Sequence, residues 1–318
     1  MRFLVGMKNL MVGVFGLACL SAIAQGFPDK PIQYTVPFPA GGESDIVARL
    51  QQDALRRLTG KEMVILNKGG AGGGLAWSQL NNLPADGYNV VSVNLPHIVL
   101  QPLEGQVQYK TADIKPVYFY TYTPDALIVS ADSPYKTLQD LVRAAKEKPD
   151  AVTIGGTGTN SANHLAAARL NEMTGIKTTY VPFKGSGDLN PMLLGNHISA
   201  MMSYTTAAFQ LKDKVRVLAI AMPQRHPRLP GVPTFKELGI DWVDGAYRGV
   251  AIPKNTPADV QRKLSDLFAQ INREPEFMQK MAAGGFELVD VPLSGVDAFM
   301  AERSKGYLVV AKAMGLIK

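Results

Sequence analysis

The chain has 318 residues, of which 46% are hydrophobic and 19% charged, and its formal net charge is +6. This length allows about two domains of ~150 residues each, with ample chain to bury a core. The composition is that of an ordinary globular protein. Its single cysteine, Cys19, lies in the apolar start of the chain, so a disulfide framework or cysteine chemistry in the rest is excluded.

The first 24 residues have the pattern of a secretory signal peptide. Arg2 and Lys8 are followed by the apolar run LMVGVFGLACLSAIA, which ends in an A-x-A site at 22–24. We predict cleavage after Ala24 and export of the remaining chain. A first buried helix is one alternative. The other is a lipoprotein cut before Cys19, but Gly16 stands where such sites usually carry Leu.

The loss of Arg2 and Lys8 would lower the net charge from +6 to +4, since no acidic residue lies in that segment. A mildly basic exported protein suits a small anionic ligand, although the same balance is common on plain solvated surfaces. We expect no nucleic acid partner.

Along the rest of the chain, β-rich apolar runs alternate with helical patterns. Helices are expected at 46–58, where Val47, Leu50, Ala54 and Leu58 share one face before Gly60, and at 137–148, 257–271 and 293–313. Such alternation predicts an α/β fold with parallel sheets and covering helices. The expected strands are 32–38, 63–67, 88–94, 126–131, 151–156, 178–183, 198–204, 215–222, 249–253 and 286–291.

The middle of the chain has a complete set of strands and helices of its own. We therefore predict one discontinuous domain, residues 25–122 with 246–318, and a second domain inserted at 123–245. The chain would cross twice between them, near 121–124 and 244–248. Two crossings form a hinge with a cleft beside it.

Two glycine-bearing loops stand between an expected strand and an expected helix. In PFPAGGESD, residues 37–45, Gly41 and Gly42 let a ligand approach the backbone, Ser44 or Asp45 can cap the helix, and free N–H groups attract an anion. GGTGTNSANH, residues 155–164, repeats the arrangement. Each loop alone can also be a plain turn. Together, one in each domain, they predict a cradle for a small acid. A third glycine run, NKGGAGGGLAW at 67–77, can either contact the cleft or form a turn without a ligand.

Motifs of enzymes are weak or missing. GGTGTN is not G-x-G-x-x-G, FKGSG is not a phosphate-binding P-loop, and neither G-x-S-x-G nor H-E-x-x-H occurs. Ser161 and His164 can share a helical face, but no third catalytic partner is indicated. The four histidines match no metal spacing. We predict no catalytic residue, no metal and no cofactor.

A series of segments, in order through nearly the whole remaining chain, resembles one family. FPDKPIQYTVPFPAGGESDIVAR, NKGGAGGGLAWSQL, ADGYNVV, DSPYKTLQDLVRAAKEKP, GGTGTNSANHLAAARL and TTYVPFKGSGDLNPMLLGNHISAM are similar to the substrate-binding proteins of tripartite tricarboxylate transporters, the Bug or TctC family. The resemblance implies a periplasmic location and a periplasmic-binding-protein-like fold whose two α/β domains close on a carboxylate, often with bridging waters. It implies membrane transporter subunits as partners, and we expect a monomer.

The resemblance and the loops together give the candidate ligand-binding residues. Arg248, beside the hinge, can grip a carboxylate, or it can form a surface salt bridge with Asp244. Glu43 should repel an anion unless it points away, and His164 is alternatively a buried residue at a helix start. The candidates are Phe38, Pro39, Ala40, Gly41, Gly42, Ser44, Asp45, Thr157, Gly158, Thr159, Asn160, Ser161, His164, Lys184, Tyr204 and Arg248.

The expected function is capture of a di- or tricarboxylate, citrate-like by preference, for a transporter. Arg248, Lys184 and the hydroxyls near Tyr204 carry the citrate preference, since they suit a ligand with more than two polar ends. One alternative is a sensor component that presents an organic acid to a receptor. An α/β hydrolase or dehydrogenase is the other, and it rests on the fold alone.

Overall fold

The computed structural model describes residues 27–313, 315 and 317 of the chain. The expected signal peptide and its cleavage after Ala24 lie outside these residues. No helix in the described part is both long enough and apolar enough to cross a membrane.

The strands of the described residues form one mixed sheet, in the order β2-β1-β3-β9-β4-β7-β5-β6, with β8 and β10 also paired to β4. Their bounds are β1 (Ile32–Val36), β2 (Met63–Asn67), β3 (Asn89–Leu95), β4 (Lys115–Ser130), β5 (Thr153–Thr157), β6 (Thr179–Phe183), β7 (Ala200–Tyr204), β8 (Val215–Ile220), β9 (Gly245–Ile252) and β10 (Glu287–Pro292). Each strand expected from the sequence is present, and the α/β class is confirmed.

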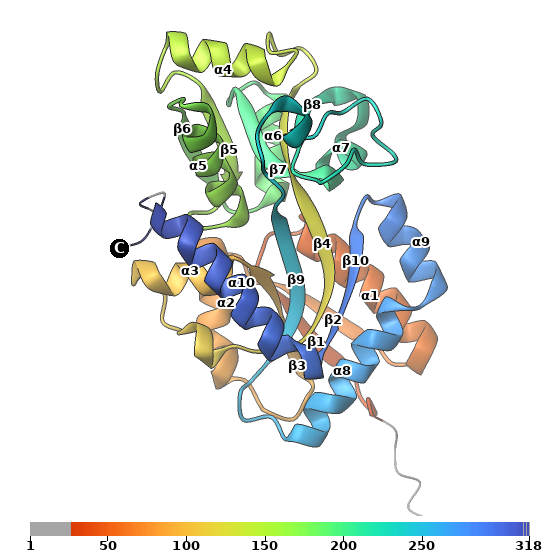
Figure 1. The fold of residues 1–318 in the computed structure, drawn as a ribbon. Helices are drawn as coiled ribbons and strands as arrows, with labels where there is room; N and C mark the ends of the chain where they lie inside the picture. Colours follow the sequence, from red (N-terminus) through yellow and green to blue (C-terminus); the bar gives the residue numbers. More distant parts are fainter. Residues whose placement is uncertain (1–26, 314, 316, 318) are drawn as a thin grey trace, which may run out of the picture.

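The helices fall into two lobes, which β4 and β9 join (Figure 1). The first lobe contains β1–β3 and β10, and its helices are α1 (Glu43–Thr59), α2 (Gly74–Gln79), α3 (His97–Glu104), α8 (Ala258–Asn272), α9 (Pro275–Ala283) and α10 (Leu293–Ala313). The second lobe contains β5–β8, and its helices are α4 (Leu138–Glu147), α5 (Ala162–Thr174), α6 (Ser186–Leu194) and α7 (Thr205–Leu211). The four helices expected from periodicity lie within three residues of their expected bounds, and α1 ends at Gly60 with a left-handed φ of 68°.

The expectation of parallel sheets holds only for part of the structure. β1 is parallel to β2 and β3, and β5 is parallel to β6 and β7. The strands β4 and β9 instead run antiparallel to each other and to their other neighbours. The physical reason is connectivity: the chain leaves the first lobe along β4 and must return in the opposite direction along β9.

The two expected crossings lie inside neighbouring strands of the sheet and not in loops. β4 has 16 residues, and its register pairs Thr121 with Arg248 and Pro124 with Gly245. Only its last five residues, 126–130, lie in the strand expected from the sequence. The division into residues 25–122 with 246–318 and 123–245 remains a proposal. It is supported by buried clusters that separate along the chain, such as that of Leu127, Phe235 and Trp242 in the second lobe.

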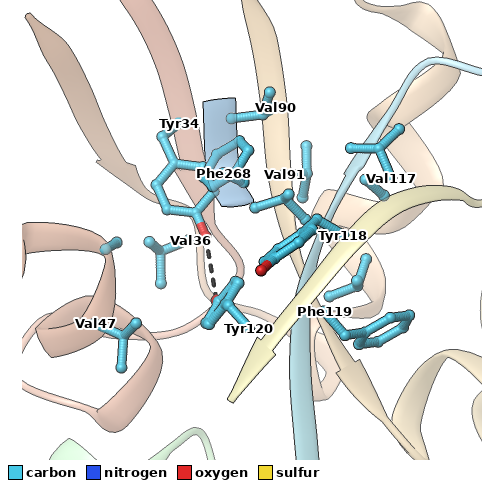
Figure 2. Packing of buried hydrophobic residues seen from close by; sticks show 14 of the residues in the cluster. Tyr34, Val36, Val47, Val90, Val91, Val117, Tyr118, Phe119, Tyr120 and Phe268 are labelled. Atoms are coloured by element: carbon cyan, nitrogen blue, oxygen red, sulfur yellow. Dashed lines mark hydrogen bonds between the residues drawn. The ribbon is translucent and has the colours of Figure 1, made fainter. Parts of the chain in front are cut away.

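The first lobe has its own core, where β1, β3, β4 and α8 meet (Figure 2). Tyr34 and Tyr120 are fully buried, and their hydroxyl groups lie 3.2 Å apart in a mutual hydrogen bond. Phe268 of α8 packs on Tyr34 with ring centroids 6.2 Å apart. The hydrogen bond satisfies two phenolic groups that would otherwise be costly to bury. The first loop directly follows β1, whose apolar side chains are buried in this core.

Candidate functional site

A pocket lies between the two lobes, at the carboxyl ends of the parallel strands. Ligands of open α/β sheets bind beyond these strand ends. The cavity itself has a volume of about 20 Å³, far below the ~300–1,000 Å³ typical of small-molecule sites. The lobes must therefore move apart before an organic acid can enter. Its lining residues are Phe38, Gly42, Glu43, Ser44, Asn94, His97, Thr157, Gly185, Ser186, Tyr204 and Arg248.

The N-terminus of α1 forms one wall of this pocket. Gly42 is its N-cap in extended conformation, and no side chain caps the helix there. Gly41 just before it has a φ of 78°, which glycine adopts without steric cost. The first N–H groups of a helix have no partner within the helix and, with the helix dipole, favour an anion.

The N-terminus of α6 approaches the same pocket from the second lobe. Gly185 is its N-cap, again without a side-chain cap. The two helix starts nearly touch, because a Cβ placed on Gly42 would lie 3.8 Å from the backbone nitrogen of Gly187. A small anion between them would therefore meet the positive ends of two helices that belong to different lobes.

Arg248 of β9 is 2% exposed and reaches the pocket, in line with the expectation that it enters the cleft. Its Nη1 donates to Thr123 Oγ1 at 2.5 Å, and its guanidinium carbon lies 4.9 Å from the ring centroid of Tyr204. Its Nη2 pairs with Glu43 Oε2. The alternative of a surface salt bridge with Asp244 is wrong, since Asp244 pairs with Arg169 at 3.1 Å.

Glu43 does not point away from the pocket. It is 4% exposed and lines the pocket, where it forms the ion pair with Arg248. Burial raises its pKa to about 7, although Arg248 acts to lower it. The expectation of a free Arg248 is thus incomplete, because its charge is already matched by a carboxylate within the site.

Two further polar side chains come from the β3–α3 connection. Asn94 is the next-to-last residue of β3, and His97 begins α3 with neither ring nitrogen hydrogen-bonded. Burial, with a smaller contribution from Arg248, lowers the pKa of His97 to about 3, so its ring is neutral near pH 7. A neutral imidazole offers one donor and one acceptor to a ligand.

The candidate residues from the sequence divide into two groups. The pocket is lined by Phe38, Gly42, Ser44, Thr157, Tyr204 and Arg248. The structure places the rest outside the lining: Pro39, Ala40, Gly41, Asp45, Gly158, Thr159, Asn160, Ser161, His164 and Lys184. Several of these residues make hydrogen bonds within the two loops. Four are exposed: Ala40, Gly41, Thr159 and Lys184.

Asp45 folds the first loop instead of lining the pocket. Its carboxylate accepts hydrogen bonds from the backbone of Gly41 at 2.9 Å, from Arg49 at 3.0 Å and from Asn67 at 3.0 Å. In the second loop, Ser161 caps α5 by accepting from the backbone N–H of His164 at 3.1 Å.

The His164 ring is likewise occupied within the second loop. It stacks on Tyr180, with ring centroids 4.4 Å apart, and its Nδ1 accepts from the backbone of Asn160. His164 thus has the position of a partly buried residue at a helix start.

The glycines of the second loop serve packing more than ligand approach. Gly155 and Gly156 lie within β5, where a Cβ would collide with Ile198 and Tyr180. Gly158 faces the third glycine run, since a Cβ on it would lie 3.3 Å from the Cα of Gly72. The third run therefore contacts the opposite lobe but does not line the pocket.

The pocket residues that sequence reasoning missed are Glu43, Asn94, His97, Gly185 and Ser186. A usable signal existed for the last two: KGSGD, at 184–188, places glycines between an expected strand and a following segment, as in the other loops. Asn94 and His97 flank the end of an apolar strand, where polar groups often meet ligands.

Residues 47–316 match the family model described as the tripartite tricarboxylate transporter family receptor, TctC. The chain belongs to this family. A relative from Cupriavidus necator, named UPF0065 protein in gbd 5'region, is 30% identical over 307 residues, which cover 95% of this chain and 94% of the relative.

Solved structures of binding proteins also match the chain. The periplasmic binding protein BugD is 28% identical with a TM-score of 0.86, over 92% of this chain and all of BugD. A protein from R. palustris solved with adipate is 26% identical with a TM-score of 0.84, over 91% of this chain and 98% of its own. The chain is therefore a solute-binding receptor of the TctC and Bug type.

Proposed function

We propose that this receptor is exported to the periplasm and captures a small carboxylate in the pocket between its lobes. It then delivers the ligand to the membrane subunits of a tripartite tricarboxylate transporter, and it acts as a monomer without catalysis. The family membership supports this role, because the family description is that of a transporter receptor.

The observation that carries the proposal is the convergence of two uncapped helix starts on one pocket. Gly42 before α1 and Gly185 before α6 belong to different lobes and contribute backbone N–H groups to the same space. A carboxylate bound there would bridge the lobes and favour their closure. Either loop alone could be a simple strand-to-helix turn without a ligand. Such turns do not account for two uncapped helix starts at one pocket.

The pocket favours a dicarboxylate over a citrate-like ligand. The citrate preference depended on an arginine free to bind a third carboxylate, and Arg248 is paired with Glu43. A third negative charge would lie beside the Glu43 carboxylate in a poorly solvated site. The adipate complex of the R. palustris relative supports a diacid ligand of comparable kind.

A thermal unfolding screen of organic acids tests the proposal. A ligand at ~100 times its dissociation constant should stabilise the folded protein by ~2.7 kcal/mol. We expect small dicarboxylates to raise the melting temperature, and neutral sugars of similar size to leave it unchanged. Stabilisation by sugars or amides but by no carboxylate would overturn the proposal.

A further inference from the structure

The ion pair in the pocket leaves one carboxylate oxygen without a partner. Glu43 Oε2 pairs with Arg248, whereas Glu43 Oε1 is buried and accepts no hydrogen bond from any described residue. The Oδ1 atom of Asn94, which lines the same pocket, is also buried without a donor. The pocket thus presents hydrogen-bond acceptors to its ligand in addition to the anion-binding helix starts.

We propose that Glu43 is a specificity-determining residue that selects acids carrying a hydrogen-bond donor, a hydroxyl or an ammonium group, beside a carboxylate. This inference rests on the proposed function and narrows its substrate class. The ligand carboxylates would meet the helix starts at Gly42 and Gly185, while the donor would meet Glu43 Oε1.

Glu43 is held in place for this role. Its partner Arg248 is fixed by a hydrogen bond to Thr123 and by the ring of Tyr204. If Glu43 turned out of the pocket, it would leave a 2% exposed guanidinium without a counter-charge. Breaking a buried ion pair in this way is strongly unfavourable, so the ligand must adapt to Glu43.

An ionised diacid without a donor suits this surface poorly. Its carboxylates are acceptors only, so Glu43 Oε1 would remain unsatisfied and would face a further negative charge. A hydroxyl on the ligand supplies the missing hydrogen bond. An ammonium group supplies it and also offsets the charge of Glu43, so it should be the stronger of the two donors.

The test is a calorimetric titration of the purified protein with matched acids at pH 8, above the pKa of about 7 of Glu43, where its carboxyl group is mostly ionised. Succinate, malate and aspartate share a four-carbon diacid skeleton and differ only by hydrogen, hydroxyl or ammonium at one carbon. We expect aspartate to bind most tightly, malate next, and succinate roughly tenfold to a hundredfold more weakly than aspartate. The glutarate, 2-hydroxyglutarate and glutamate set repeats the comparison with a longer chain.

The variant Glu43→Gln should reverse this preference. We expect its affinity for aspartate to fall roughly tenfold or more, and its affinity for succinate to rise or stay unchanged. Glu276→Gln is the matched control, since Glu276 also lies in the first turn of a helix and is ion-paired, with Arg57 and Lys280, but outside the pocket. The control should keep the native order of affinities.

The outcomes distinguish the role of Glu43 from carboxylate binding itself. If succinate binds the unmodified protein as tightly as aspartate and malate, or if Glu43→Gln weakens all three acids equally, the role of Glu43 is overturned while carboxylate binding stands. If no acid of either set binds, the proposed function fails as well. The comparison on the unmodified protein decides the inference even if the variant does not fold.

Discussion

The carboxylate of Asp45 accepts a hydrogen bond from the backbone N–H of Gly41 at 2.9 Å, and this contact closes the first loop over the start of α1. Arg49 adds two hydrogen bonds to the same carboxylate, both of 3.0 Å. The Asp45 carboxylate therefore stabilises the loop conformation, and the neighbouring N–H groups of α1 stay available for a ligand.

Asp45→Asn should weaken both the fold and the pocket. Loss of charge-assisted hydrogen bonds typically costs ~1.5–3 kcal/mol, and a looser loop would no longer hold Gly42 against α6. We expect lower stability in denaturant titration together with lower carboxylate affinity. A loss of stability with unchanged affinity would show that the Asp45 hydrogen bonds do not shape the pocket.

The same contact predicts a pH dependence. Burial raises the pKa of Asp45, but hydrogen bonds from Arg49, Gly41 and Asn67 outweigh it and the pKa lies below its ordinary value. The folded pKa is thus below the unfolded value of about 3.9. The stabilisation is fully present above pH ~5 and is lost as the pH falls through the folded pKa. In Asp45→Asn, the free energy of unfolding should therefore depend less on pH below pH 4 than in the native protein. An equally steep dependence in both proteins would contradict this.

Gly187 offers a way to weaken lobe closure without unfolding α6. A Cβ on Gly187 would lie 2.9 Å from the backbone oxygen of Ala40 in the opposite lobe. Alanine is otherwise a better helix residue than glycine by ~1 kcal/mol. We therefore expect Gly187→Ala to keep its thermal stability but to bind carboxylates roughly tenfold more weakly.

The control for this variant is Gly306→Ala in the exposed interior of α10, where nothing lies within 4 Å of an added Cβ. It should gain ~0.5–1 kcal/mol of stability with unchanged affinity. Calorimetry and thermal unfolding measure both quantities. Equal affinities for Gly187→Ala and the control would mean that the contact with Ala40 is not needed for binding.

Arg248→Ala should destabilise the protein in a pH-dependent way. Removal of one partner of a buried ion pair costs ~3–5 kcal/mol. Burial raises the pKa of Glu43 to about 7 even beside Arg248, and the variant should raise it further. Since the folded pKa lies above the unfolded value of ~4.3, protonation of Glu43 stabilises the folded state at low pH, and this contribution is lost as the pH rises.

The loss of stability in Arg248→Ala should accordingly be smaller at pH 5 than at pH 8 in denaturant titrations. Glu43→Gln combined with Arg248→Ala should recover part of it, because no buried charge remains without a partner. An equal loss at both pH values, or additive effects of the two substitutions, would exclude strong coupling between these residues.

Citrate provides a separate test of the charge argument. The native protein should bind citrate more weakly than a four-carbon diacid, since the third carboxylate would lie near Glu43. Glu43→Gln removes that charge and frees Arg248, so its affinity for citrate should rise roughly tenfold or more in calorimetry. Citrate binding the native protein most tightly would restore the preference that the sequence suggested.

The sequence predicted the first loop well because the loop follows from local signals. An apolar strand, a glycine pair and an amphipathic helix place Phe38, Gly42 and Ser44 at a strand end, and all three line the pocket. Asp45 was expected to bind the ligand, but Glu43 lines the pocket and Asp45 does not. Which of them faces inward depends on the direction from which Arg248 and Arg49 approach, and this direction is a tertiary property.

The second loop was predicted less well, and the reason is again tertiary. Of the residues expected there, only Thr157 lines the pocket. The β6–α6 connection lies closer to Gly42 and supplies Gly185 and Ser186 in its place. Glycines in a strand are ambiguous in sequence, because a tight contact such as that of Gly156 with Tyr180 looks the same as room for a ligand.

The most direct test of carboxylate binding in this pocket is a crystal structure of the protein grown with aspartate or malate. We expect one acid between the helix starts at Gly42 and Gly185, with its donor within hydrogen-bond distance of Glu43 Oε1. An acid bound elsewhere, such as beside Arg169 and Asp244, with the pocket between the helix starts free of it, would contradict carboxylate binding at this site.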